Sequence, residues 1–254
     1  MTFGGGSLTS GQDALHAEGT VENITLTSTQ VTGNNGWLIQ SLASGTVPSV
    51  VNLSASDSTL MTGAAFSDSI STLNVALGSP STWSMTGNSV VTTTTNAGVI
   101  EYAAPVAGIY KTLTTNDYVG QSGAIKLNTW LGNDSSPSDK LVINGGAASG
   151  TTTLDIANTG GPDALTTDKG ILVVETINGG STAVGAFVLS SPVTAGGYSY
   201  ALYRNTNGNW YLSNNPKDWR GSGGGATAVP ALNPAALALL AVALALMVFR
   251  QRRW

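Results

Sequence analysis

Short runs of alternating apolar and polar residues, separated by turn residues, extend along most of the chain and restrict the folds it can adopt. Examples are VENITLT at 21–27, AIKLNTWL at 124–131 and ILVVETI at 171–177. Because a β-strand points successive side chains to opposite faces, this alternation predicts strands with one buried face. Turn-forming stretches such as NGGAASG at 144–150 lie between the runs. The pattern therefore predicts an all-β body.

A faint internal repeat indicates how these strands are arranged. STQVTG occurs at 28–33, STLMTG at 58–63 and STWSMTG at 81–87, so the final glycines, at 33, 63 and 87, lie 30 and then 24 residues apart. A strand that ends in the same Thr-Gly turn at such intervals is expected from successive coils of a parallel β-helix, in which each coil buries its apolar face against its neighbours. Loop insertions account for the unequal spacing. We therefore predict a solenoid.

Composition excludes several classes of function. Of the 254 residues, 9% are charged, against about 25% in an average globular domain. The net charge of −4 provides no basic surface for nucleic acid, so no nucleic-acid partner is expected. The chain has no cysteine, which excludes disulfides and thiolate metal sites. No cofactor and no metal are predicted.

An aromatic stretch at 198–213, YSYALYRNTNGNWYLS, differs from the rest of the body. The turn NTNGN at its centre predicts an antiparallel hairpin. A solenoid has an open end whose unpaired backbone groups invite aggregation, so it needs a terminal cap. The hairpin is predicted to be that cap, and the alternative is a hairpin within an ordinary sandwich. Its predicted capping residues are Tyr198, Tyr200, Tyr203, Trp210 and Tyr211.

The end of the chain is unlike its body. Residues 214–228 predict a flexible linker, and the 21 residues from Val229 to Phe249 carry no charge, which is about the number that spans a bilayer as an α-helix. The basic residues Arg250, Arg252 and Arg253 follow. By the positive-inside rule they are predicted to stay in the cytoplasm, which places the body outside it. A membrane partner is therefore expected through residues 229–249.

The start of the chain gives a different expectation. MTFGGGSLTSGQDALHAEG has neither the basic segment nor the apolar segment of a signal peptide. Because the tail predicts export, we expect this sequence to be a fragment of a longer exported protein, with a misplaced start as the alternative.

Several ordered motifs resemble a known family. They are TLNVALGSPSTWSMTGNS at 72–89, YKTLTTNDYVGQSGAIKLNTWLG at 110–132, SDKLVINGGAASGTTTLDIANTGG at 138–161, GILVVETINGGSTAVGAFVLSS at 170–191 and the hairpin at 198–213. Residues 72–213 resemble the C-terminal, pertactin-like part of autotransporter passenger domains, including the autochaperone region. Residues 1–71 are similar in style to upstream coils. The resemblance implies a right-handed parallel β-helix whose last coils and hairpin act as folding nucleus and cap, without catalytic residues.

The tail departs from that family, because no β-barrel sequence follows the linker. It is similar to C-terminal sorting signals of the IPTL-CTERM and PEP-CTERM kind, in which a short Pro-containing motif precedes an apolar helix and a basic end. The residues at the motif position are Val229, Pro230, Ala231 and Leu232. The resemblance implies export by the general secretory route and a sorting protease or secretion machinery as partner. It also implies a tail held initially in the inner membrane.

Candidate chemical groups are few. The single histidine, His16, lies near Asp13 and is expected to be a surface residue. Two carboxylate pairs, Asp134 with Asp139 and Asp163 with Asp168, are predicted to be solvated turn residues.

Two further points concern metal binding and packing. Calcium binding by Asn133, Asp134 and Asp139 is an alternative for the first carboxylate pair, because oxygen ligands suffice. The tryptophans at 37, 83 and 130 are expected to be buried or half-buried packing residues, with an exposed aromatic for glycan stacking as the alternative.

The predicted function is that of a non-enzymatic, adhesion-related part of a surface-displayed β-helix in a bacterial envelope. It would lie at the cell surface or outer membrane, or be secreted, and its expected partner is a glycan or protein receptor. The alternatives are a polysaccharide-acting β-helix enzyme and an envelope protein whose tail anchors it permanently.

Overall fold

The fold is taken from a computed structural model, which describes residues 1–215. All described residues lie in one compact unit, Met1–Gly224. The predicted sorting motif, the predicted helix at 229–249 and the three arginines fall outside the described residues. Within residues 1–215, no helix is long and apolar enough to cross a membrane.

Strands and turns make up the described part of the chain, which confirms the all-β prediction. The strands are β1 (Thr2–Gly4), β2 (Ser7–Ser10), β3 (Leu15–Glu18), β4 (Val21–Thr27), β5 (Gln30–Leu42), β6 (Val50–Ser56), β7 (Leu60–Ser67), β8 (Thr72–Leu77), β9 (Thr82–Met85), β10 (Ser89–Asn96), β11 (Val99–Tyr102), β12 (Thr112–Thr129), β13 (Lys140–Asn144), β14 (Ala147–Asn158), β15 (Ile171–Ile177), β16 (Ser181–Thr182), β17 (Phe187–Leu189), β18 (Val193–Ala195), β19 (Tyr198–Arg204) and β20 (Trp210–Ser213).

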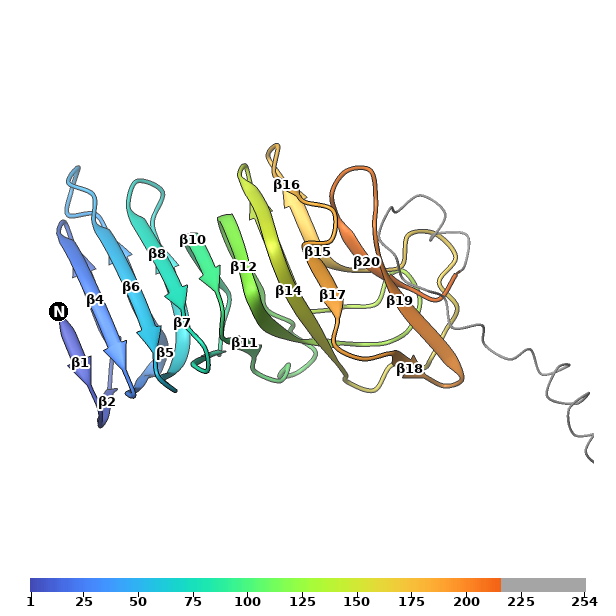
Figure 1. The fold of residues 1–254 in the computed structure, drawn as a ribbon, viewed down its shortest axis with the longest axis horizontal. Coiled ribbons are helices and arrows are strands. Elements are labelled where there is room, and N and C mark those ends of the chain that lie inside the picture. The colour runs from blue at the N-terminus through green and yellow to red at the C-terminus, as the bar shows by residue number, and fades with distance from the viewer. Residues whose placement is uncertain (216–254) are drawn as a thin grey trace, which may run out of the picture. The chain divides into compact units, whose positions relative to one another are not determined.

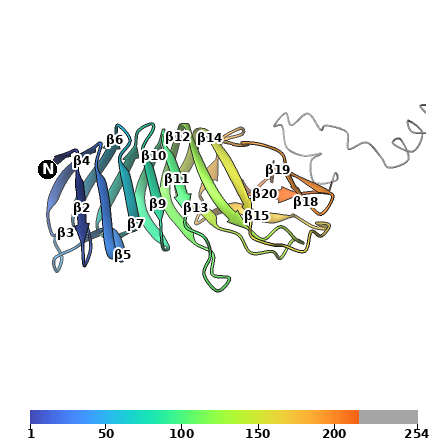
Figure 2. The ribbon, with the colours of Figure 1, turned by 90° about the horizontal axis from the view of Figure 1, so that it is seen from below.

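The strands wind into coils with three faces, and each face is a parallel sheet (Figures 1 and 2). The first face stacks β1, β4, β6, β8, β10, β12, β14 and β16. The second stacks β2, β5, β7, β9, β11, β12, β14 and β17. The third stacks β3, β5, β7, β10, β12, β13 and β15. This parallel stacking is the predicted solenoid; its right-handed sense stays a prediction.

The sequence repeat corresponds to stacked positions on the second face. Val31 pairs with Met61, and Met61 pairs with Trp83, so the three motifs lie directly over one another. Two of the repeated glycines are required by close backbone approach. A Cβ at Gly33 would lie 1.7 Å from the Trp37 carbonyl oxygen, and Gly63 adopts a φ of 133°. The repeat is thus confirmed as a feature of the coils.

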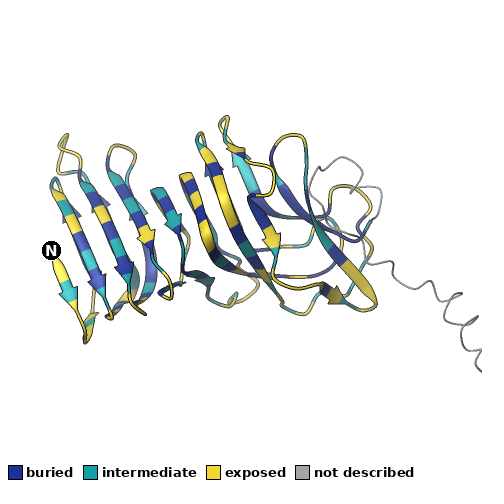
Figure 3. Cartoon of the chain, viewed as in Figure 1, coloured by how far each residue is buried: buried dark blue, intermediate teal, exposed yellow. Residues whose placement is uncertain are grey.

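Burial alternates along the strands, so each face sends one set of side chains into a continuous core (Figure 3). Buried hydroxyls link the coils at their corners. The Thr29 backbone N–H donates to Thr59 Oγ1 at 3.4 Å, and the Thr59 N–H donates to Ser81 Oγ at 3.1 Å. Each hydroxyl therefore satisfies a backbone group of the coil below, which a buried corner requires.

Candidate capping and folding site

Three long loops occupy the same corner of successive coils, between the second and third faces. They span residues 103–111, 130–139 and 159–170, and we call them the loop stack. At the same corner of earlier coils the connections are short, as at 11–14 and 86–88. The loop stack therefore distinguishes the C-terminal coils from the N-terminal ones.

Hydrogen bonds join the three loops to one another. The Tyr110 hydroxyl lies 2.5 Å from Thr159 Oγ1 and so connects the first loop to the third. The Asp163 N–H donates to the Leu131 carbonyl at 3.2 Å and connects the third loop to the second. Loops fixed in this way cannot move independently of their coils.

Asp134 fastens the second loop to the third. Its carboxylate accepts hydrogen bonds from the backbone N–H groups of Thr167, Asp168 and Gly170, at 2.8, 3.1 and 2.6 Å. Desolvation alone would raise the pKa of Asp134, but these hydrogen bonds outweigh it and hold the pKa below its usual 3.8. Asp168, from the second carboxylate pair, is exposed as predicted.

Asp139 corrects the prediction of a solvated turn residue, because it is completely buried. One carboxylate oxygen accepts from the Lys111 N–H at 2.6 Å, and the other accepts from the N–H and side-chain amide of Asn128 at 2.8 and 2.7 Å. The Lys111 ammonium is buried nearby and donates to the carbonyls of Ala103 and Ala104. Nothing in the local sequence around Asp139 and Lys111 indicated that the solenoid wall would enclose these two residues.

Asp163 also differs from the prediction of a solvated turn residue, since it is only partly exposed. It adopts a φ of 55°, and its Oδ1 atom is buried without a hydrogen-bond partner. The space beside it is filled by Gly196, where a Cβ would come within 2.1 Å of the Asp163 Cβ. Asp163, in the third loop, is thus packed against the turn that precedes β19.

The calcium alternative gains no support from this arrangement. Asn133 turns its side-chain oxygen to the N–H of Ser135 at 3.1 Å, while Asp134 and Asp139 are each bound to different segments. Among residues 1–215, no group of three histidine or carboxylate side chains is placed to hold a metal ion.

The predicted hairpin is present and changes the direction of pairing on the third face. β20 pairs antiparallel with β15, β19 pairs antiparallel with β20, and β18 pairs antiparallel with β19. In Figure 1 these strands lie at the end of the stack away from the N-terminus. The third face therefore ends in an antiparallel extension, whereas the first and second faces end at the short strands β16 and β17.

Trp210 closes the end of the first two faces. Its ring lies 5.5 Å from that of Phe187 on β17, edge to face, and its Nε1 donates to Thr182 Oγ1 on β16 at 2.9 Å. The Arg204 guanidinium donates to the Thr182 carbonyl at 2.7 Å. One aromatic side chain thus contacts both short strands.

Tyr200 joins the hairpin to the loop stack. It is buried, and its hydroxyl donates to the carbonyls of Gly132 and Ala164 at 3.1 and 2.9 Å. Burial raises the pKa of this hydroxyl, and the negative charge of Asp163 adds to the effect. Asn214 also donates to the Ala164 carbonyl, at 2.9 Å.

The remaining predicted cap residues divide into two groups. Tyr203 and Tyr211 are buried and stack with their ring centres 5.5 Å apart, and the Tyr203 hydroxyl donates to the Lys169 carbonyl. Tyr198 is 37% exposed and lies at the start of β19. The hairpin therefore brings four of the five aromatic residues into the interior.

A polar chain inside the solenoid was not apparent from the sequence. Asn96 donates to the Tyr118 hydroxyl at 3.1 Å, and that hydroxyl lies 2.9 Å from Thr152 Oγ1. Burial raises the pKa of Tyr118 to about 12. These hydrogen bonds link three successive coils. In the sequence, the one feature that could have indicated them is a tyrosine at an inward position of an alternating run.

The histidine and two of the tryptophans agree with their sequence-based expectations. His16 lies exposed on β3, with Nδ1 3.0 Å from Asp13 Oδ2. Trp83 is fully buried and Trp37 is partly buried, as expected for packing residues. Trp130 is 39% exposed at the first position of the second loop, which fits the alternative of an exposed aromatic residue.

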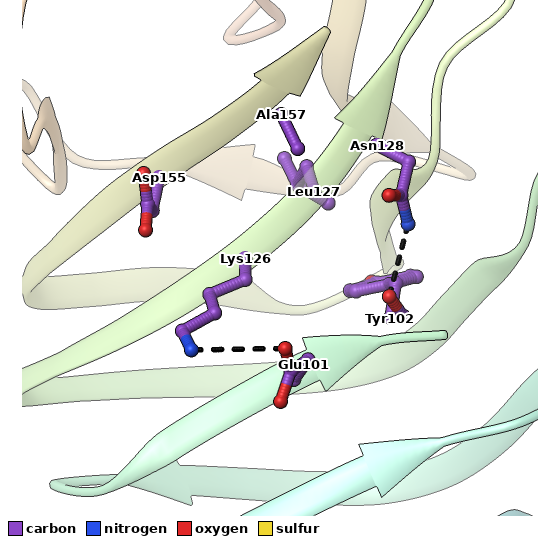
Figure 4. Close-up of a pocket in the computed structure, with 7 residues that line it drawn as sticks. All are labelled: Glu101, Tyr102, Lys126, Leu127, Asn128, Asp155 and Ala157. Carbon is purple, nitrogen blue, oxygen red and sulfur yellow. Dashed lines mark hydrogen bonds and ion pairs between the residues drawn. The ribbon is translucent and has the colours of Figure 1, made fainter. Parts of the chain in front are cut away.

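A shallow hollow of about 110 Å³ lies on the outer side of the second face (Figure 4). Glu101, Lys126 and Asp155 form a row across three coils, with Lys126 3.6 Å from Glu101. Asp155 accepts from Ser190 at 3.2 Å. We call this the outer hollow, and its lining residues are Glu101, Tyr102, Lys126, Leu127, Asn128, Asp155 and Ala157.

The outer hollow bears on the enzyme alternative. Glycoside cleavage needs one carboxyl group shielded from water so that it stays protonated as the acid. The Glu101 side chain is 43% exposed and paired with a lysine, and Asp155 is exposed. We call this row the ion ladder, and neither of its carboxyl groups is shielded as that reaction requires.

Two family models match the chain. Residues 89–202 match Autochaperone Domain Type 1, and residues 227–253 match the IPTL-CTERM motif. The resemblance to an autotransporter passenger end followed by an IPTL-CTERM-type tail is thus confirmed. The first match begins after the predicted boundary at residue 72, and it includes the loop stack and the start of the hairpin.

Similar proteins agree with these matches. The chain is 38% identical over 128 residues to the protein YuaQ of Escherichia coli, covering 49% of this chain and 9% of that protein. It is 35% identical over 131 residues to the adhesin BmaC autotransporter of Brucella suis, covering 46% and 4%. The match therefore spans less than a tenth of either relative. The Haemophilus influenzae Hap adhesin structure is 22% identical with a TM-score of 0.45, covering 84% of this chain and 24% of that one.

Proposed function

We propose that this chain is the C-terminal part of an exported, surface-displayed β-helical protein, in which residues 89–215 fold and cap the coil stack. One observation carries the proposal: the hairpin ends the parallel third face, while Trp210 contacts the last strands of the other two. A terminal element of this kind satisfies edge groups that would otherwise pair with other chains.

The relatives, rather than the geometry, support the proposal of export and adhesion. A named relative is an autotransporter adhesin, and the tail matches a C-terminal sorting motif. The proposed role is non-enzymatic and adhesion-related, with a glycan or protein receptor as partner. The proposed location is the cell surface or outer membrane, or the secreted fraction, with residues 229–249 held first in the inner membrane.

The role in folding is tested with two tryptophans of matched burial. In the full chain, kept soluble by mild detergent, Trp210→Ala is compared with Trp83→Ala, which lies in the N-terminal coils. If the cap belongs to the folding nucleus, Trp210→Ala slows refolding from urea, whereas Trp83→Ala mainly speeds unfolding. The opposite partition would overturn the nucleus and leave the hairpin as a passive end.

The role of the tail is tested by mass spectrometry of both termini of the native protein in separated cell fractions. A C-terminus near Val229–Leu232 in the surface or medium fraction supports sorting with removal of the tail. A protein that keeps Arg250 to Trp254 in the envelope supports the permanently anchored alternative. Recovery of that intact tail in the cytosol would overturn the proposed export.

A further inference from the structure

Trp130 and the outer hollow lie on the same side of one strand. Along β12 and the residue after it, Lys126, Asn128 and Trp130 alternate with the buried residues Leu127 and Thr129, so the first three point outward. At about 3.3 Å of rise per residue, Trp130 lies about 13 Å from Lys126. Lys126 and Asn128 line the outer hollow, and the exposed Trp130 follows two residues beyond Asn128, on the same outward side of the chain.

The third loop lies beside the indole. Gly160 of the third loop lies against it, since a Cβ on that glycine would come 3.7 Å from Trp130 Cζ3. The neighbouring Thr159 is fixed by its contact with the Tyr110 hydroxyl. A large aromatic surface that is both exposed and preorganised is typical of a contact site, because exposure costs free energy that a ligand can recover.

Between the ion ladder and Trp130, the side chains are short or already engaged. Ala157 on β14 pairs with Asn128 on β12. The Asn128 amide is committed to the carbonyls of Tyr102 and Ala103 and to Asp139. Asn128 is thus part of the wall, and the polar groups open to a ligand are those of Glu101, Lys126 and Asp155.

These groups suit a sugar chain. A sugar ring offers an apolar C–H face that packs on an indole, and hydroxyls that donate to carboxylates and accept from an ammonium. Three coils span about 10 Å and the distance along β12 is about 13 Å, so these groups lie within about the length of a short oligosaccharide. Two carboxylates against one ammonium disfavour an acidic glycan.

We propose that Trp130 and the outer hollow form a binding site for a neutral or amino-sugar oligosaccharide. The proposal deepens the proposed adhesion role by naming the class of receptor, and it rests on that role for its biological meaning. Binding by the purified protein does not depend on export, so a failure of either proposal is distinguishable from a failure of the other.

The test uses the full chain in mild detergent on a glycan array that carries neutral, amino and acidic oligosaccharides. The strongest neutral or amino trisaccharide is then titrated by calorimetry. Trp130→Ala is expected to weaken binding about tenfold or more, as for a central aromatic contact. Asp155→Ala is expected to weaken it less. Tyr198→Ala, which removes an aromatic residue of similar exposure on the hairpin, should leave the affinity within about twofold.

Three results would overturn the proposal: no glycan bound by the wild-type chain, unchanged binding by Trp130→Ala, or preferential binding of acidic glycans. Circular dichroism of each variant separates a lost contact from a lost fold. If Trp130→Ala alters the fold, Trp130→Phe is used, which keeps an aromatic ring and should retain partial affinity.

Discussion

In residues 1–88 the same contacts recur from coil to coil, whereas in residues 89–215 most polar contacts occur once. The N-terminal coils repeat a corner hydroxyl ladder through Thr29 and Thr59, and an outer amide ladder in which Asn74 donates to Asn52 and Asn52 donates to Asn23. The C-terminal coils instead bury individual groups such as Asp139. Repeated contacts tolerate a change in the number of coils, while single contacts define one place in the stack.

This difference explains why the end of the solenoid can act as a unit. A regular coil interacts only with its neighbours, so its stability is local. Tyr200 contacts Gly132, 68 residues earlier in the chain, and Tyr110 contacts Thr159, 49 residues later, so both contacts span more than one coil. Contacts of this kind couple the loop stack, the last coils and the hairpin, and we expect residues 89–215 to unfold together.

The largest expected effect concerns Trp210. Trp210→Ala removes the contact with Phe187 and the hydrogen bond to Thr182, so it should lower the free energy of unfolding by about 3–5 kcal/mol. Hydrogen exchange measured by mass spectrometry should show the loss in residues 89–215 and not in residues 1–88. Equal loss of protection in both regions would mean that the stack is one cooperative unit. Tyr198→Ala, an exposed control, should change stability by less than about 0.5 kcal/mol.

The next effect concerns the buried carboxylate. Asp139→Ala leaves the N–H of Lys111 and the N–H and amide of Asn128 without their acceptor, and should cost about 3 kcal/mol. Urea unfolding monitored by tryptophan fluorescence measures the change. Asp168→Ala, at an exposed position of the same loop stack, is the matched control. A similar small effect of both substitutions would show that Asp139 is not a structural anchor.

High pH should distinguish the two regions without any substitution. All seven tyrosines lie at residue 102 or beyond, and burial raises the pKa of Tyr118 to about 12 and that of Tyr102 well above 10. Because the folded pKa of Tyr118 exceeds the unfolded value of 10, its contribution is complete below pH 10. As pH rises from 10 through 12, we expect a loss of about 2–3 kcal/mol. Hydrogen exchange at several alkaline pH values would contradict this if residues 1–88 lost protection first.

The smallest expected effect concerns the repeated ladder. Thr59→Val removes a buried hydroxyl that donates to the carbonyls of Leu26 and Ser56 and accepts from Thr29. We expect a loss of about 1–2 kcal/mol, confined to the coils on either side. Thr46→Val at an exposed corner is the control. Loss of protection as far as the hairpin would break the distinction between local and coupled regions.

Alternation and the repeated Thr-Gly motif predicted the strands, the parallel stacking and the place of the hairpin, because these depend on local periodicity and turn chemistry. The candidate site was only partly predictable. The aromatic residues of the hairpin were found because aromatic side chains around an NTNGN turn are distinctive. Asp139 was placed wrongly, since a carboxylate in a Ser- and Pro-containing loop resembles a surface turn until the adjacent coil covers it.

The sequence by itself determined that this protein is a solenoid of short strands. Apolar residues with a period of two, and turns at intervals of one coil, leave few other ways to bury the apolar side chains. The tertiary structure decided which loops lie over one another. It brought Tyr110 to Thr159, enclosed Asp139, and left Trp130 exposed. The physical reason is that stacking brings together residues from different coils, and the lengths of the loops decide which residues meet. No local sequence pattern indicates which side chains those will be.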